Sequence, residues 1–298
     1  PAPNGLLDLF GQIYILDEGN SLGRYITHYR TSFFYPSGYG GYEWKPQSDA
    51  MERISKRISP LVLRLERKDY LELPELSVDY RYVTLPPAAR QQYNLMETQL
   101  VAAIDRGAVI AANAAVASSK CRQIANGAIY WGKELREDFD KVDYEVIHRE
   151  KLTALGDLIE ELSGQPLFIL YEFEFDRDLI HKELGVPYFG RSAKKDSELN
   201  DLFNAGLIQA VMGHPASVGY GLNLQGACAH VCWYAQTWNL EHFEQATDRI
   251  YRQGQKADRV VVHHIVAEDT IDEVVIKTLQ SKDRTQQALL TNLKQLRS

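Results

Sequence analysis

Apolar residues in the second half of the chain follow two alternating patterns. Short apolar runs, of the length of buried strands, occur at Leu167–Tyr171, Ile208–Met212, His230–Ala235 and Arg259–Val266. Segments with helical apolar spacing are Glu150–Leu162, Asp176–Leu184, Lys195–Phe203, Asn239–Arg252 and Thr270–Gln280. Short apolar strands that alternate with amphipathic helices indicate an α/β fold, in which a parallel sheet is covered on both faces.

The first half of the chain has a different character and is predicted to be mostly helical. Gly38–Trp44 is rich in glycine and aromatic residues and is predicted to be a loop. Ser48–Ser59 is predicted to be an amphipathic helix, and Val78–Leu85 alternates like a strand. Two prolines then open a predicted helix at Ala88–Asp105. Residues 106–148 are predicted to be a connection, with a hinge near Glu134–Tyr144.

Composition narrows the classes of protein. The chain has 298 residues, of which 45% are hydrophobic and 24% are charged, so it is long enough for two globular domains. It contains no apolar run of about 18 residues, which argues against a membrane span. Its three cysteines fit a reduced, cytoplasmic setting. The sequence opens at Pro1 without a methionine, and we expect it to be part of a longer protein.

The net charge of −7 does not indicate a nucleic-acid-binding protein, so a site for nucleic acid would need a local basic surface. Ligands of parallel sheets bind beyond the carboxyl ends of the strands. One segment expected there is Gly213–Ala227, GHPASVGYGLNLQGA. Its Gly219 and Gly221 would let the backbone approach a phosphate. An ordinary turn after a strand explains these glycines as well.

The start of the predicted helix Asn239–Arg252 is also expected at that edge, and this helix leads into Gln245–Lys256, QATDRIYRQGQK. On a regular helix, Gln245, Arg249 and Arg252 would lie within about 60° of one another. A solvated face, with Asp248 paired to Arg252, is the simple explanation. The alternative is a phosphate site, because the planar, always charged arginine fork binds phosphate oxygens at two points. Arginine fingers of this kind accelerate phosphoryl transfer roughly 10³–10⁵-fold.

The two segments together resemble a known family. GxGLNLQ, a strand, TWN and QxxDRxxRxGQ follow one another, which is similar to motifs V and VI of superfamily-two helicase-like ATPases. The Swi/Snf-like branch of DNA translocases, and especially its small phage and bacterial members, is most similar. The usual sequence there is GxGLNL, WNP and QAxxRxxRxGQ. Leu240 replaces the proline of WNP, and Val218 stands where many relatives have another glycine.

The resemblance covers most of the chain and implies its domains. Pro1–Asn4 resembles the end of motif III, and PLFILYEF resembles motif IV. Ser59–Pro74 resembles the end of a helical insertion, and Thr270–Lys282 resembles the closing helix. Residues 1–146 would be the C-terminal remainder of a first RecA-like lobe with its insertion and linker. Residues 147–298 would be the second RecA-like lobe, with a parallel sheet.

The resemblance also implies a division of labour around ATP. A lobe upstream of Pro1 would hold the phosphates and Mg²⁺, and this chain would complete the site. Arg252 would be the main finger, with Arg249 beside it. The residues implied to bind the nucleotide are Gln245, Gly219, Gly221 and Asn223. The fragment alone would be inactive as an ATPase, and the whole protein would move along double-stranded DNA.

Contacts to DNA are implied less specifically. The matching tryptophan of relatives reaches the DNA, which implies the same for Trp238, although a core aromatic residue explains it equally. Ser217 and Gln225 could bind backbone phosphates. Arg191 and Lys194 lie in the basic run GRSAKK, which a solvated loop explains as well.

Two further patterns are rejected as sites. Gly127–Glu134 has the spacing of a phosphate-binding loop, but it lacks the final Ser or Thr and contains bulky residues. Cys228, His230 and Cys232 have neither the spacing nor the second pair of a zinc site. Adjacent strand residues such as His263 and His264 point to opposite faces. No metal site is therefore expected in this chain.

The preferred interpretation is the C-terminal part of an ATP-dependent translocase on double-stranded DNA. One alternative is a helicase that separates strands of DNA or RNA. The other is a non-catalytic module that binds nucleic acid or protein.

Overall fold

The computed structural model describes residues 5–37, 43–62, 73–105, 111–130, 144–190, 192–218 and 222–282. The chain divides into two compact units. One comprises Pro1–Tyr70, Arg106–Ile110 and Lys277–Ser298, and the other comprises Leu71–Asp105 and Ala111–Ile276.

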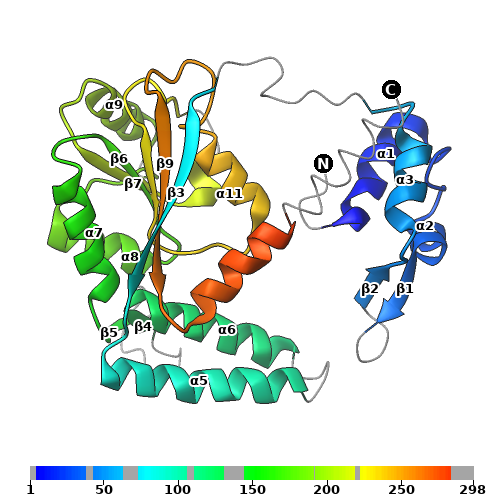
Figure 1. Cartoon of the computed structure of the whole chain (residues 1–298), viewed down its shortest axis with the longest axis horizontal. Helices are drawn as coiled ribbons and strands as arrows, with labels where there is room; N and C mark the ends of the chain where they lie inside the picture. Colours follow the sequence, from blue (N-terminus) through cyan, green and yellow to red (C-terminus); the bar gives the residue numbers. More distant parts are fainter. Residues whose placement is uncertain are drawn as a thin grey trace. The chain divides into compact units, whose positions relative to one another are not determined.

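The larger unit is built on a parallel sheet (Figure 1), and this confirms the predicted α/β fold. The strands of the described residues are β3 (Glu75–Val83), β6 (Leu167–Leu170), β7 (Ala210–Gly213), β8 (His230–Trp233) and β9 (Arg259–Ala267). They lie in the order β3-β9-β8-β6-β7, and every neighbouring pair is parallel. The predicted strands of the second half are thus confirmed within a few residues.

Helices cover both faces of this sheet. On one face lie α7 (Glu150–Glu161) and α8 (Glu174–Leu184), and on the other lie α9 (Ala193–Asn204) and α11 (Leu240–Thr247). Alternate residues of β6 serve the two cores: Ile169 packs with Leu155 of α7, whereas Phe168 packs with Phe203 of α9. All four residues of β6 are buried, as expected for a strand that is covered on both sides.

Strand β3 comes from the first half of the chain. It pairs with β9 over nine residues, from Glu75 opposite Arg259 to Val83 opposite Ala267. The alternating pattern predicted this strand, but it did not predict its partner. The sheet thus includes residues from before the predicted domain boundary at 146, which follows the motifs and stays a prediction.

The predicted connection over residues 106–148 is wrong for much of its length. Ala111–Asn126 forms helix α6, which packs beside α5 (Pro87–Asp105), as Figure 1 shows. Strands β4 (Ala128–Tyr130) and β5 (Tyr144–Val146) then pair antiparallel. Alanine is the strongest helix former, so an alanine-rich stretch is better suited to a helix than to a linker. Most of the predicted hinge lies outside the described residues.

The smaller unit consists mainly of short helices around an aromatic core. Its elements are η1 (Leu6–Asp8), α1 (Leu9–Asp17), α2 (Ile26–Phe33), β1 (Phe34–Ser37), β2 (Glu43–Pro46) and α3 (Ala50–Ile58). Tyr29, Phe33 and Ile54 are fully buried at its centre. Trp44 lies in β2, which pairs with β1, so the predicted loop is wrong at that end. Residues 38–42 lie outside the described part.

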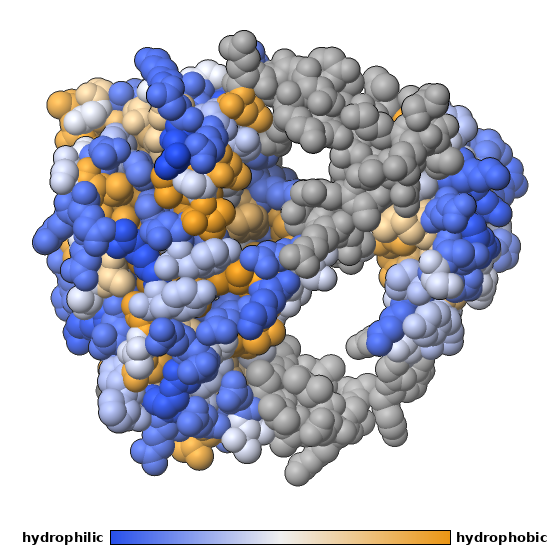
Figure 2. Space-filling view, viewed as in Figure 1, coloured by the Kyte–Doolittle hydropathy of each residue, from blue (hydrophilic) through white to orange (hydrophobic). Residues whose placement is uncertain are grey.

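The visible face of the larger unit carries many polar residues (Figure 2). Figure 2 shows apolar residues in small groups among hydrophilic ones on the visible face of this unit. Among the described residues, none of the helices combines the length and the apolar composition that crossing a membrane requires.

Candidate functional site

The sequence predicts a candidate site at the edge of the sheet where its parallel strands end. Five segments leave the sheet there, after β3, β6, β7, β8 and β9. The glycine-rich segment, Gly213–Ala227, begins at the end of β7 and contains α10 (Pro215–Val218). The segment after β8 leads into α11. This is the edge at which α/β sheets bind their ligands.

The turn before α11 is fixed by hydrogen bonds between neighbouring residues. The hydroxyl of Thr237 accepts a hydrogen bond from the backbone N–H of Asn239 at 3.2 Å. The side-chain oxygen of Asn239 in turn accepts one from the N–H of His242, also at 3.2 Å. Asn239 is therefore an N-cap, which satisfies an N–H group that the first helical turn would leave unpaired.

Helix α11 is shorter than predicted, so Arg249 and Arg252 lie beyond the regular helix on whose face they were predicted. It ends at Thr247 rather than at Arg252. Beyond it, Ile250 N–H bonds to the Thr247 carbonyl at 3.1 Å, and Arg252 N–H bonds to the Ile250 carbonyl at 3.1 Å. Tyr251 N–H still bonds to the Thr247 carbonyl at 3.0 Å, but the contacts of Ile250 and Arg252 span only three and two residues, so the regular α-helix does not continue. Apolar spacing missed this end because Ile250 is buried in the core whether or not the helix continues.

Arg249 and Arg252 are nevertheless brought close together. The guanidinium of Arg249 is partly buried, and its Nη1 donates to the Leu222 carbonyl at 3.5 Å. Burial and the nearby charge of Arg252 lower the pKa of Arg249, and the carboxylate of Asp248 offsets this only in part. Two cations that repel each other beside the glycine-rich segment favour an anion as their ligand, because an anion offsets the repulsion.

The other residues predicted to bind the nucleotide are placed differently. Gln245 is exposed, and its amide donates to Glu241 Oε1 on the same helix at 2.9 Å. The backbone carbonyl of Asn223 accepts from Asn204 Nδ2 at 2.9 Å, which ties this segment to α9. Gly219 and Gly221 lie outside the described residues. The contacts of the described residues do not join Gln245 to the arginine pair.

The hydrogen bonds and ion pairs of the described residues do not bring the residues predicted to contact DNA together on one surface. Ser217 donates from its hydroxyl to the His214 carbonyl at 2.9 Å. The side-chain oxygen of Gln225 is buried and accepts no hydrogen bond from the described residues. Trp238 is half-buried, and Lys194 is 88% exposed at 3.9 Å from Glu198. Arg191 lies outside the described residues, and all these DNA contacts stay predictions.

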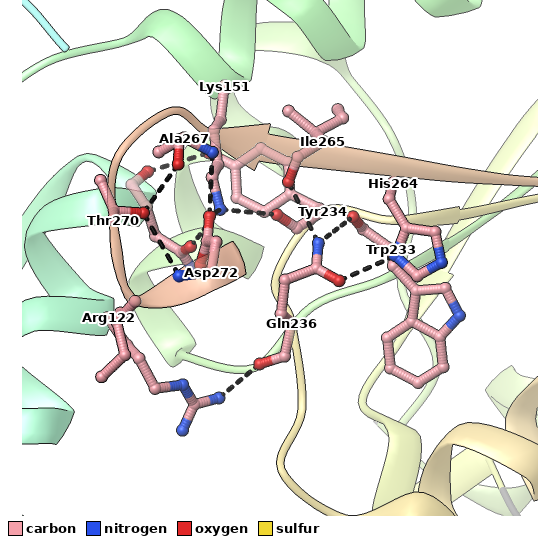
Figure 3. A network of polar contacts seen from close by, with 12 residues as sticks. Arg122, Lys151, Trp233, Tyr234, Gln236, His264, Ile265, Ala267, Thr270 and Asp272 are labelled. Atoms are coloured by element: carbon pink, nitrogen blue, oxygen red, sulfur yellow. Dashed lines mark hydrogen bonds and ion pairs between the residues drawn. The ribbon is translucent and has the colours of Figure 1, made fainter. Parts of the chain in front are cut away.

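A buried polar network at the same edge was missed by sequence reasoning (Figure 3). Lys151 Nζ lies 2.6 Å from Asp272 Oδ2, and their side chains are 0% and 2% exposed. Lys151 also donates to Asn126 Oδ1 at 2.8 Å. The signal in the sequence was the position of Lys151 on the same side of its helix as Leu155 and Leu158, where a lysine needs a buried partner.

A buried carboxyl extends this network. Asp176 accepts hydrogen bonds from the N–H of Phe173 at 2.9 Å and from Asn126 Nδ2 at 3.1 Å. Burial nevertheless raises its pKa to about 7. Asn126 thus lies between Lys151 and Asp176 and joins α6 to both α7 and α8.

The cysteine and histidine patterns contribute to the interior of the fold. Cys228 Sγ donates to the Pro166 carbonyl, and burial raises its pKa to about 12. His263 Nδ1 lies 2.9 Å from Asp79 on one side of β9. His264 Nδ1 lies 2.8 Å from Gln236 Oε1 on the other side. Within the described ranges, no group of three or more His, Cys, Asp and Glu residues could hold a metal ion.

Comparisons with known proteins show relatives in phages and bacteria. No family model matches the chain. "Putative protein p41" of Acyrthosiphon pisum secondary endosymbiont phage 1 is 34% identical, over 99% of this chain and 63% of its own length. The "Putative ATP-dependent helicase/translocase YwqA" of Bacillus subtilis is 26% identical, over 77% of this chain and 26% of its own length. The chain therefore spans less than two thirds of both relatives.

Solved structures share the fold. The C-terminal part of the Fun30 ATPase domain superposes with a TM-score of 0.53 at 14% identity, over 74% of this chain and 99% of that structure. The Sulfolobus solfataricus SWI2/SNF2 ATPase core domain gives a TM-score of 0.52 at 22% identity, over 94% of this chain and 57% of that structure. The chain thus has the fold of SWI2/SNF2 ATPase domains and is similar to the C-terminal portion of Swi/Snf-like, helicase-like ATPases.

Proposed function

We propose that this chain is the C-terminal part of an ATP-dependent translocase on double-stranded DNA, and that it supplies arginines to the ATP site. The observation that carries the proposal is the interaction between the charges of Arg249 and Arg252, in the segment between α11 and β9 of a RecA-like lobe. The segment that bears them follows α11. This helix begins at the N-cap Asn239, shortly after β8, so β8 and the cap help to fix the position of the segment.

In this proposal the two arginines act on the phosphates of ATP. Arg252 is exposed and is the main finger, because its guanidinium can reach a ligand outside the lobe. Arg249 is partly buried and supports it from the side of Leu222. An N-terminal lobe outside this chain would hold Mg²⁺, which would supply positive charge to the phosphates. Gln245, Gly219, Gly221 and Asn223 approach the nucleotide, as the motifs imply.

Double-stranded DNA is the proposed track, and the setting is the cytoplasm of a bacterial or phage-infected cell. The name of the B. subtilis relative includes both helicase and translocase, and p41 is a phage protein, which support these choices. Trp238, Ser217, Gln225, Arg191 and Lys194 are the proposed DNA contacts. Contacts with the DNA backbone carry no sequence information, which suits a motor that moves over any sequence.

The experiment is steady-state ATP hydrolysis by the longer protein that we propose to contain this chain. It is measured without nucleic acid, with single strands and with duplex DNA, for the wild type and for Arg252→Ala. We expect strong stimulation by duplex that the substitution abolishes. Arg259→Ala is the matched control, because Arg259 is an exposed arginine that pairs with Glu75 where β9 begins.

Other outcomes would favour the other candidate functions. Stimulation by single strands or RNA alone, together with unwinding of a labelled duplex, would favour a strand-separating helicase. Hydrolysis that is absent or indifferent to Arg252 would favour a non-catalytic binding module and would contradict the proposal.

A further inference from the structure

Arg122 of α6 contacts two segments at the candidate edge of the sheet. Its Nη2 donates to the Gln236 carbonyl at 2.7 Å and lies 3.0 Å from Glu172 Oε1. The guanidinium also lies over the ring of Phe173, 5.4 Å from its centre. The side chain is only 12% exposed. One guanidinium therefore joins α6 to the segments that follow β6 and β8.

The side chain of Gln236 makes hydrogen bonds of its own, as Figure 3 shows. Its amide Nε2 donates to the carbonyls of Trp233 at 3.2 Å and Ile265 at 3.1 Å. Its Oε1 lies 2.8 Å from His264 Nδ1. Burial lowers the pKa of His264 to about 3, so the ring is neutral near pH 7 and Nδ1 carries the proton that it donates. Gln236 is thus fixed to β8 and β9 by its side chain and to α6 by its backbone.

The next three residues lead into α11, and the segment after α11, called here the arginine segment, bears Arg249 and Arg252. Thr237 and Trp238 follow Gln236, and Asn239 caps α11. A change in the position of the Gln236 carbonyl therefore changes where α11 begins. The displacement would pass along the two turns of α11 to the segment after it, which bears Arg249 and Arg252.

Helix α6, which bears Arg122, is also held by hydrogen bonds to its neighbours. Four residues along α6 from Arg122, Asn126 accepts from Lys151 and donates to Asp176, both of which are buried. Lys151 is paired to Asp272. Helix α6 is thus anchored in the buried polar network, and Arg122 extends from this anchored helix to the turn before α11.

We propose that Arg122 is a positioning residue: it holds the Gln236–Asn239 turn and thereby sets the position of α11 and of the two arginines that follow it. Arginine suits this role because its planar guanidinium fixes the direction of the Nη2 donors toward a carbonyl and a carboxylate and also lies over the ring of Phe173, whereas a lysine offers a compact point charge on a flexible stem. The positioning is a property of the fold, and its consequence for ATP hydrolysis rests on the proposed function.

The structural part is tested by ¹⁹F NMR of the 298-residue chain labelled with 5-fluorotryptophan. Trp238→Phe assigns the Trp238 signal. We expect Arg122→Ala to shift or broaden this signal and to leave that of Trp44, in the other unit, unchanged. Arg259→Ala should change neither signal. A Trp238 signal at its wild-type position in Arg122→Ala would overturn the proposal.

Two further variants separate positioning from loss of folding. Arg122→Lys keeps a cation but loses the fork, and we expect it to move the Trp238 signal at an unchanged melting temperature. Glu172→Gln removes the charge pair and keeps the bond from Arg122 to the Gln236 carbonyl, so the signal should stay in place. The proposal would be overturned if Arg122→Lys left the signal unmoved, or if Glu172→Gln moved it as far as Arg122→Ala does.

The catalytic part is tested by hydrolysis in the longer protein. Misplacement of a catalytic group by about 1 Å can cost on the order of 10²-fold in rate. We expect Arg122→Ala to lower the duplex-stimulated kcat by about 10- to 100-fold, with the KM for ATP within about twofold of the wild type. A wild-type kcat in Arg122→Ala, with Arg252→Ala inactive, would overturn the catalytic consequence alone. Absence of duplex stimulation in the wild type would instead contradict the proposed function, and the NMR result would still decide the positioning.

Discussion

Two polar regions of the larger unit are built in opposite ways. Lys151, Asp272, Asn126 and Asp176 are buried, and each has hydrogen bonds or an ion pair of 2.6 to 3.2 Å. The arginine segment instead holds two like charges near each other, with a bond of 3.5 Å from Arg249 to a carbonyl. Opposite charges that are paired in the interior help to hold the folded chain together. Adjacent like charges at the surface repel each other, and a bound ligand of opposite charge can offset that repulsion.

Breaking the buried ion pair should have the largest effect on stability. We expect Lys151→Met to lower the free energy of unfolding by about 3–5 kcal/mol, because it leaves Asp272 buried without its cation. Urea denaturation of the chain measures this change. Arg259→Ala, which removes an exposed ion pair, should cost less than about 1 kcal/mol. A loss as small as this in Lys151→Met would show that the buried network does not hold the fold.

The carboxyl of Asp176 should make stability depend on pH. Burial raises its pKa from an ordinary value of 3.8 to about 7, so between these values the folded state binds more protons than the unfolded state. This contribution to stability is complete below pH 3.8 and is lost as the pH rises to about 7. Relative to Asp176→Asn, the wild type should therefore lose stability between pH 4 and pH 7.

The measurement is the melting temperature of both proteins at intervals across this range. Asp176→Asn can carry a constant penalty from its altered hydrogen bonds, so the test is the change of the difference with pH. A difference that stays constant or reverses sign would show that Asp176 is ionised in the fold throughout.

Removing one of the like charges should have the smallest effect on stability. We expect Arg249→Ala to change the free energy of unfolding by less than about 0.5 kcal/mol, because the lost packing and the relieved repulsion offset each other. The same urea denaturation checks this value. A loss above about 2 kcal/mol would place Arg249 with the residues that hold the fold and would remove the contrast between the two regions.

The sequence predicted the elements that a local pattern defines. Strands β6 to β9 and their covering helices were predicted because apolar spacing marks buried strands and helix faces. The partner of β3 was not predicted, since pairing between residues 75–83 and 259–267 depends on the whole sheet. Helix α6 was missed because its apolar residues are mostly alanines, which resemble a linker in a hydropathy pattern but favour helix formation.

The candidate site was predicted in part. Motif order led to Arg249 and Arg252, and the structure brings their charges close, although α11 ends at Thr247. Arg122 and Gln236 were not found, because their contact joins residues 114 positions apart through a backbone carbonyl. Such a contact depends on how α6 packs, and a carbonyl has no residue type that a sequence could reveal.

The most direct test of the central claim is the kcat for ATP hydrolysis by the longer protein at saturating duplex DNA, in Arg252→Ala against Arg259→Ala. The account predicts a loss of roughly 10³-fold or more in Arg252→Ala and a wild-type rate in Arg259→Ala. Equal rates in the two variants would contradict it, because the arginine pair would then have no part in phosphoryl transfer.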